Sequence, residues 1–431
     1  MPGRAAIAAY RFIHAADIHL DSPLRSLALR DSDLASLIGD ATRQAFVGIV
    51  DLALAERVDA LMIAGDLYDG EQTSMKTARF LADQLRRLDE AGIRVFLIRG
   101  NHDALSKITQ ELIFPPGVKL YRGRGEVVEV ERAHGAVPIA VHGLSFAKPQ
   151  APESLLPGYR TPVADAVNIG LMHTSLAGAP GHDVYAPASL ADLQSHGFDY
   201  WALGHIHQRA AHQGPATIVM AGMPQGRDIN EAGPKSVSLV TIADDRSVHV
   251  EERLTSIAEF RRVAVDASGL TEWSDLVAAV GTALAAARAE TRSPHLVARL
   301  ELAGTTPLAW RIRRDADLLK AEADMAAARH GDAHVEKLVL GVANPIVAGD
   351  GADPLVELAR LIGADVLEAP AFRAGLGEWT AQLSGQLPGE LRDLFGGDEA
   401  TAAALITRLA AEGTEEVLAR LQADAPAGSD D

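Results

Sequence analysis

The chain has 431 residues, of which 48% are hydrophobic and 23% charged, so it resembles packed globular proteins and exceeds the length of one ordinary domain. It has no cysteine, which excludes disulfides, thiolate metal sites and cysteine nucleophiles. The net charge of -18 is concentrated in residues 346–431, which carry 16 acidic and 5 basic residues. Without a signal-peptide pattern or an apolar run of roughly 20 residues, we expect a cytoplasmic protein that does not contact a membrane.

The first part of the chain predicts alternating strands and helices. Short apolar runs that end in polar residues predict buried strands at 10–16, 60–64, 93–98, 138–142, 167–172 and 198–203. Amphipathic stretches at 33–56 and 74–91 predict helices between the first three strands. Residues 217–220, 236–242 and 247–251 predict further strands without helices between them, and we expect a second sheet there.

The rest of the chain predicts a small α/β unit followed by a helical region. Strands are expected at 260–265, 295–302 and 336–340, and helices at 273–289 and 315–329. Beyond them, short helical segments broken by Gly and Pro are expected at 354–362, 387–395, 400–412 and 415–421, before a disordered end. The predicted domains are therefore residues 1–257, 258–345 and 346–431.

Five clusters of metal-binding residue types follow five of the predicted strands. They are Asp17-Ile18-His19, Gly65-Asp66, Gly100-Asn101-His102-Asp103, His173 and Gly204-His205-Ile206-His207. The carboxyl ends of strands in an α/β sheet form one crevice, so these clusters are expected to converge. Alternation along an extended segment would direct both members of Asp-x-His and His-x-His to one side. One histidine at a strand end is more often a core residue, but five ordered clusters favour a metal site.

The five clusters, within residues 10–225, resemble the calcineurin-like metallophosphoesterase superfamily. Within that pattern, 16–21 and 65–69 are similar to bacterial DNA repair exonucleases of the SbcD type, and 224–227 with 231–235 to the YhaO type. The resemblance implies an α/β fold, a sandwich of two mixed β-sheets flanked by helices. It also implies a small α/β capping domain at 258–345 and a helical C-terminal region.

By position, the resemblance assigns a role to each cluster. One metal ion would be held by Asp17, His19, Asp66 and His207, and a second by Asp66, Asn101, His173 and His205, with Asp66 bridging through its two oxygens. His102 matches the catalytic histidine, and Asp103 beside it is the expected orienting carboxylate. At the position of Asp69, archaeal and eukaryotic relatives carry a histidine implicated in exonuclease action, whereas bacterial relatives share the aspartate.

The predicted function is metal-dependent hydrolysis of phosphodiester bonds in DNA during repair, as an exonuclease with endonuclease action left open. An imidazole and carboxylate set suits Mn, Fe, Zn or Ni better than Mg or Ca, and we predict two divalent ions, Mn²⁺ in each case. Hydroxide would attack phosphorus while His102 acts as general acid. The alternatives are a phosphodiesterase or phosphatase acting on a small nucleotide or phosphoprotein, and a non-catalytic scaffold. The long segment beyond residue 257 favours a macromolecular substrate, and the seven filled ligand positions argue against a scaffold.

The expected partners are DNA, a second copy of the chain and an ATPase. The resemblance implies a homodimer formed through helices of residues 1–257, and an SMC-like ATPase bound through residues 346–431. Short helices with apolar stripes can hardly be buried within an isolated C-terminal region, which agrees with a protein partner. Arg311, Arg313 and Arg314 beside Trp310 are a candidate phosphate contact, although a solvated charged strand is at least as good an interpretation.

Overall fold

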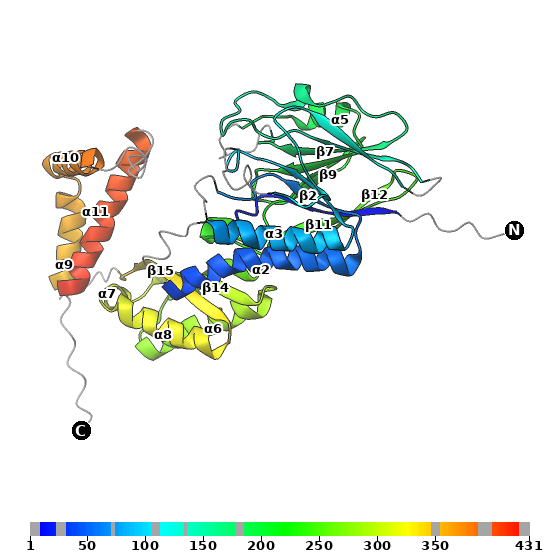
Figure 1. The fold of residues 1–431 in the computed structure, drawn as a ribbon. Coiled ribbons are helices and arrows are strands. Elements are labelled where there is room, and N and C mark those ends of the chain that lie inside the picture. The colour runs from blue at the N-terminus through cyan, green and yellow to red at the C-terminus, as the bar shows by residue number, and fades with distance from the viewer. Residues whose placement is uncertain are drawn as a thin grey trace. The chain divides into compact units, whose positions relative to one another are not determined.

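The computed structural model describes residues 9–22, 32–69, 74–104, 113–132, 136–176, 185–345, 354–386 and 399–421. The chain divides into two compact units. Figure 1 labels the helices and strands along the chain. The first comprises residues 1–261 and 290–297, and the second comprises 262–289 and 298–431. None of the helices in these described ranges is both long and apolar enough to cross a bilayer.

The first unit contains two six-stranded mixed sheets, which confirms the predicted fold class. The order in the first sheet is β12 (Val248–Leu254), β11 (Ser236–Ile242), β1 (Tyr10–Ala15), β2 (Ala60–Ala64), β3 (Arg94–Ile98) and β4 (Val118–Leu120). The order in the second is β5 (Glu126–Val130), β6 (Ile139–Gly143), β7 (Val167–His173), β8 (Tyr200–Gly204), β10 (Thr217–Met220) and β9 (Ala210–His212).

The expectation that residues 217–251 form a second sheet of their own is wrong. Strand β10 pairs parallel with β8, whereas β11 pairs antiparallel with β1 and β12 antiparallel with β11. The three strands are thus divided between the two sheets. Their apolar patterns indicated strands correctly, but pairing is decided by partners far away in the sequence.

Alternating side chains of β1 explain why the first sheet is buried on both faces. Tyr10 and Phe12 belong to the core between the two sheets, together with residues of β7 and β8. Ile13 and Ala15 belong to a second core, formed with helices α2 (Ser32–Glu56) and α3 (Met75–Glu90). The two helices lie side by side along this face (Figure 1). A strand with both faces covered reads as a continuous apolar run, as this one does.

A buried histidine connects the two sheets near the carboxyl end of β1. His14 is fully buried, and its Nε2–H donates to the carbonyl oxygen of Leu203 on β8 at 3.2 Å. Its Nδ1 accepts the hydroxyl of Tyr200 at 3.0 Å. Burial lowers the pKa of His14 to about 3, because a charged imidazole would lose its hydration there.

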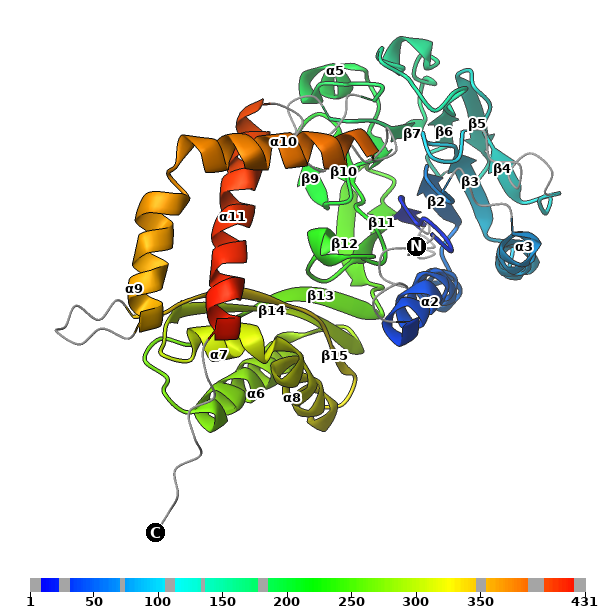
Figure 2. The same ribbon diagram turned by 90° about the vertical axis from the view of Figure 1, so that its left-hand side faces the viewer.

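The second unit contains a three-stranded sheet with helices packed on it. Its order is β13 (Ala258–Asp266), β14 (His295–Thr305) and β15 (Ala333–Ala343), and β13 and β14 begin in the first unit. Helices α6 (Trp273–Glu290) and α8 (Ala316–Arg329) lie on one side of this sheet (Figure 2). Both bury an apolar stripe at helical spacing, which in α6 includes Leu276, Val280 and Leu284.

The C-terminal helices belong to the same unit. They are α9 (Pro354–Leu361), α10 (Pro370–Gln386) and α11 (Glu399–Leu421), with a π-helical turn at Ile362–Val366. Helix α11 covers the two segments predicted at 400–412 and 415–421, with Gly413 inside it, and α10 was not predicted. The helix predicted at 387–395 lies outside the described residues. Figure 2 shows one end of α11 in contact with α7 (Ala309–Arg314), and α9 lies beside α11.

The candidate phosphate contact at residues 310–314 is wrong as far as its aromatic neighbour is concerned. Trp310 is buried against Leu418 and Ala419 of α11, and its Nε1–H donates to Glu415 at 3.1 Å. Arg313 donates to the carbonyl of Val342, and Arg314 is paired with the neighbouring aspartate at position 315. A Trp beside arginines is therefore part of the core here, because α11 covers it.

Replacing His14 with Gln should reduce the acid sensitivity of the metal-free protein. As the pH falls below 6.5, His14 takes up a proton only when the chain unfolds, so the wild-type free energy of unfolding decreases until about pH 3. Between pH 6 and pH 4 we expect the free energy of unfolding of His14→Gln to decrease by about 2 kcal/mol less than that of the wild type. Denaturant unfolding at several pH values measures this. The control is His249→Gln, an exposed position on β12, and an unchanged slope in His14→Gln would contradict the assignment.

Candidate metal centre

The predicted site residues converge at one edge of the sandwich. Strands β1, β2 and β3 run parallel in one sheet, as do β6, β7 and β8 in the other, so their carboxyl ends meet. The loops or last residues of these strands carry Asp17, His19, Asp66, Asn101, His102, Asp103, His173, His205 and His207. The hydrogen bond from His173 Nδ1 to the carbonyl of Ala64, 2.9 Å long, joins the two sheets at this edge.

The backbone reason that we gave for the Asp-x-His pair is wrong. Asp17 and His19 lie beyond the end of β1 with φ of 50° and 45°, in the left-handed region and not in an extended strand. Asp66 and His205 also have positive φ, at 51° and 108°. Such conformations cost about 1–3 kcal/mol for a non-glycine residue and gather at functional sites. Both side chains reach one site because the loop is coiled there.

Glycines precede the site residues because the strand ends approach each other closely. A Cβ at Gly65 would lie 2.4 Å from His173 Nδ1, and a Cβ at Gly100 would lie 2.3 Å from an oxygen of Asp66. Neither position has room for a side chain. The Gly-Asp and Gly-Asn pairs are thus a steric requirement of this edge.

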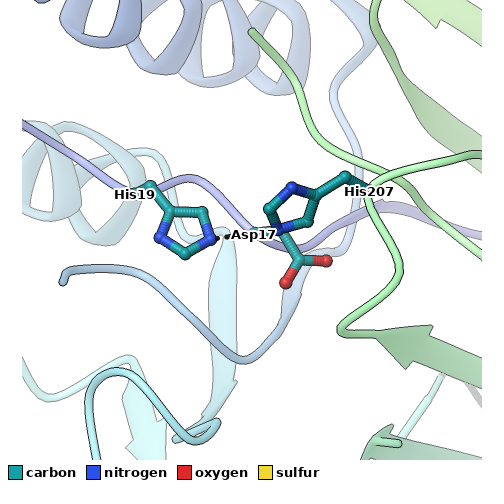
Figure 3. A group of neighbouring side chains, drawn as sticks. All are labelled: Asp17, His19 and His207. Atoms are coloured by element: carbon teal, nitrogen blue, oxygen red, sulfur yellow. Dashed lines mark hydrogen bonds between the residues drawn. The ribbon is translucent and has the colours of Figure 1, made fainter. Parts of the chain in front are cut away.

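Asp17, His19 and His207 form a first group, whose ligand-type atoms lie within 4.8 Å of one another. Figure 3 shows the two imidazoles facing each other beside the carboxylate, with 3.3 Å between their Nε2 atoms. The Nδ1 of His19 is 2.7 Å from Asp69, and the Nδ1 of His207 is 2.8 Å from Glu231. Because each carboxylate accepts a proton-bearing nitrogen, both Nε2 lone pairs are directed into the group.

Asp17, Asp66 and His173 form a second group with the same spacing. His173 donates its Nδ1–H to Ala64, and its Nε2 lies 2.9 Å from Asn101 Oδ1 and 3.3 Å from Asp66 Oδ2. Burial lowers the pKa of His173, but the charges of Asp66 and Asp17 outweigh burial and raise it to about 9. The same negative charge would attract a divalent cation.

Asp66 and His205 connect the two groups. Asp66 Oδ2 lies 4.0 Å from His19 Nε2 and 3.3 Å from His173 Nε2, whereas Oδ1 accepts the backbone N–H of His102. Oδ2 of Asp66 therefore faces both groups. The backbone N–H of His205 donates to Asp17 at 2.9 Å, and the His205 ring lies against that of His173, with 5.1 Å between centroids.

The prediction that Asp103 orients His102 is corrected by the structure. Asp103 is buried and accepts the backbone N–H groups of Leu67 and Gly100 at 3.0 and 2.7 Å. Burial and the nearby Asp66 charge raise its pKa to about 7. The carboxylate beside the imidazole is instead Asp69, with Oδ1 3.1 Å from His102 Nδ1. This hydrogen bond raises the pKa of His102, whose side chain is 48% exposed.

Sequence reasoning also missed Arg227 and Glu231. Both belong to the stretch 224–235 that was singled out only for its resemblance. Glu231 contacts His207, and Arg227 binds Glu231. No periodicity marks them, because they lie around a short 3-10 turn, Ile229–Glu231, outside the strands.

Comparison with known proteins agrees with this geometry. Residues 10–209 match the family described as calcineurin-like phosphoesterase, and residues 260–343 match the middle domain of metallophosphoesterase YhaO. The chain is 33% identical over 298 residues to the uncharacterized metallophosphoesterase YhaO of Bacillus subtilis strain 168, covering 69% of this chain and 72% of that protein.

More distant relatives are archaeal and are named DNA double-strand break repair protein Mre11. The chain is 28% identical over 218 residues to that of Sulfurisphaera tokodaii, which covers 50% of this chain and 54% of the relative. It is 23% identical over 281 residues to that of Methanopyrus kandleri, which covers 61% of this chain and 56% of the relative. The chain thus spans about half the length of these two relatives.

Asp69→Asn should lower the pKa of His102, because a neutral amide no longer stabilises the imidazolium. Asp103→Asn should leave this pKa near its wild-type value, since Asp103 bonds to backbone groups. Titration of the His102 ring by NMR in metal-free protein measures both. A drop in Asp103→Asn alone would restore Asp103 as the orienting carboxylate.

Proposed function

The chain belongs to the calcineurin-like phosphoesterase family of dinuclear metal-dependent hydrolases, and we propose that it is a nuclease that cleaves phosphodiester bonds in DNA. The observation that carries the proposal is the convergence of carboxylate, amide and imidazole acceptors on one edge of the sandwich. The relatives named for double-strand break repair support DNA as the substrate.

The residues at this edge fit two divalent cations. The Nε2 atoms of His19, His173 and His207 face the two groups, while each Nδ1 is bonded to a carboxylate or carbonyl oxygen. Acceptors this close together repel one another unless positive charge lies among them. One cation would be held by Asp17, His19, Asp66 and His207, and the other by Asp66, Asn101, His173 and His205. We propose Mn²⁺ for both.

The reaction divides between the cations and His102. When bound, two divalent cations polarise the phosphate and lower the pKa of a water nucleophile. His102 lies beside His19, with 5.0 Å between ring centroids, and its Nδ1 is held by Asp69. Its Nε2 is therefore the atom that would donate a proton to the leaving oxygen. The raised pKa of His102 favours the protonated imidazolium, which is the form that a proton donor needs.

Exposed apolar side chains on the C-terminal helices support the proposal of a protein partner. On α10, Phe372, Trp379 and Leu383 are spaced at helical intervals, and the last two are 70% and 56% exposed. This stripe accompanies an excess of acidic over basic residues in 346–431, which disfavours contact with DNA. We propose that this stripe binds an SMC-like ATPase.

We further propose that residues 1–257 are the nuclease domain, residues 258–345 the capping domain and residues 346–431 the partner-binding region. Helices of residues 1–257 would form a homodimer.

Asp66→Asn should lose both metal ions, because Asp66 Oδ2 faces both groups. His102→Asn should keep both ions and lose turnover about 10²- to 10⁴-fold, since it removes only the proton donor. Metal analysis of the purified proteins, with digestion of linear duplex DNA and of a chromogenic phosphodiester in Mn²⁺, tests this. A His102 variant without metal would move that residue into the ligand set. Cleavage of the small ester without cleavage of DNA would favour the small-substrate alternative.

Replacing Trp379 and Leu383 together with Ala should abolish co-purification with the ATPase while leaving metal-dependent cleavage and thermal unfolding unchanged. Both side chains are exposed, so their removal costs little packing. The control is Trp310→Ala, which removes the buried contact with α11 and should lower the unfolding temperature. Retention of the ATPase by the double variant would refute this surface.

A further inference from the structure

Glu231 contacts the Nδ1 side of the His207 imidazole, and Arg227 binds the same carboxylate. Its Oε1 is 2.8 Å from His207 Nδ1 and accepts Arg227 Nη2 at 2.8 Å. Its Oε2 accepts the backbone N–H of Arg227 at 2.7 Å. Each oxygen of the carboxylate thus has a donor, so the side chain has one orientation.

Arg227 extends the network to the opposite side of the same group. Its Nη1 lies 3.8 Å from Asp69 Oδ2 and donates to Ser22 Oγ at 3.3 Å. Asp69 in turn is 2.7 Å from His19 Nδ1. One guanidinium therefore lies between the two carboxylates that contact His207 and His19, and its positive charge offsets part of their mutual repulsion.

The network is shielded from solvent and anchored in the fold. The side chains of Glu231 and Arg227 are only 11% and 18% exposed. The segment that carries them is fixed by Gln225, which accepts the N–H of Ile257 at 2.7 Å and donates to the carbonyl of Ala258 at 2.8 Å. Ile229, between the two charged residues, is buried in the core. The positions of both side chains are thus fixed by burial and backbone hydrogen bonds.

We propose that Glu231 and Arg227 are positioning residues of the metal centre. Glu231 fixes the ring orientation and the Nδ1–H tautomer of His207, and Arg227 holds Glu231 and Asp69 at the distance that this requires. The proposal rests on the proposed metal-dependent function. It assigns a role to the stretch 225–231, which contacts His207 through Glu231 and Asp69 through Arg227.

Two measurements test the role of Glu231. In ¹⁵N-histidine-labelled metal-free protein, at a pH where His207 is neutral, its ring should be an Nδ1–H tautomer in wild type and a mixture of tautomers in Glu231→Gln. The His207 signals are assigned by their loss in His207→Gln. In a Mn²⁺ titration followed by the EPR signal of the free ion, Glu231→Gln should weaken one of two sites by ~10- to 100-fold and leave the other unchanged.

The matched control is Glu259→Gln, another buried carboxylate of the first unit, which bonds to Arg292 and Ser293. It should bind both Mn²⁺ ions as wild type does. Arg227→Gln is a second variant that keeps the backbone N–H to Glu231, and the same site should weaken by a smaller factor. If Glu231→Gln does not fold, the Mn²⁺ titration of Arg227→Gln tests the positioning role.

The outcomes separate this proposal from the proposed function. If wild type binds two Mn²⁺ ions and both Glu231→Gln and Arg227→Gln bind them as Glu259→Gln does, the positioning role is refuted and the metal centre stands. If wild type binds no Mn²⁺, both proposals fail. A selective loss at one site with a changed His207 tautomer supports the role.

Discussion

The hydrogen bond between His173 and the carbonyl of Ala64 sets the geometry on which the rest of the candidate site depends. It joins the end of β7 in one sheet to the end of β2 in the other. This closeness leaves no room for a Cβ at Gly65 or Gly100 and directs the second nitrogen of His173 toward Asp66 and Asn101. A sandwich whose sheets were further apart would carry the same residues without bringing their acceptor atoms together.

The site combines features that oppose folding. Asp17 and Asp66 are carboxylates within a core, and burial raises the pKa of Asp17 because water no longer solvates its charge. Four site residues also have left-handed backbone conformations. Hydrogen bonds from neighbouring imidazoles and backbone groups offset part of this cost, and divalent cations would offset more. The extensive hydrophobic cores on both faces of the first sheet stabilise the fold enough to tolerate such a site.

Carboxylates behind the imidazoles are a recurring element of this edge. Asp69 accepts from both His19 and His102, while Glu231 accepts from His207. One carboxylate thus contacts a candidate metal-binding histidine and the candidate proton donor together. Changes at Asp69 are therefore expected to alter metal binding and proton transfer jointly, whereas changes at Glu231 act directly on His207.

The sequence by itself determined the residue types at the site, the strands that carry them and the family. Apolar runs ending in ligand-type residues are local signals, and five of them in order identify the pattern. Tertiary structure alone decided how β10, β11 and β12 divide between two sheets, that Trp310 lies beneath α11, and that Asp69 and not Asp103 accompanies His102. It also decided that Asp17 and His19 converge through a coiled loop. These facts depend on contacts between residues tens to hundreds of positions apart, for which a one-dimensional pattern carries no distance information.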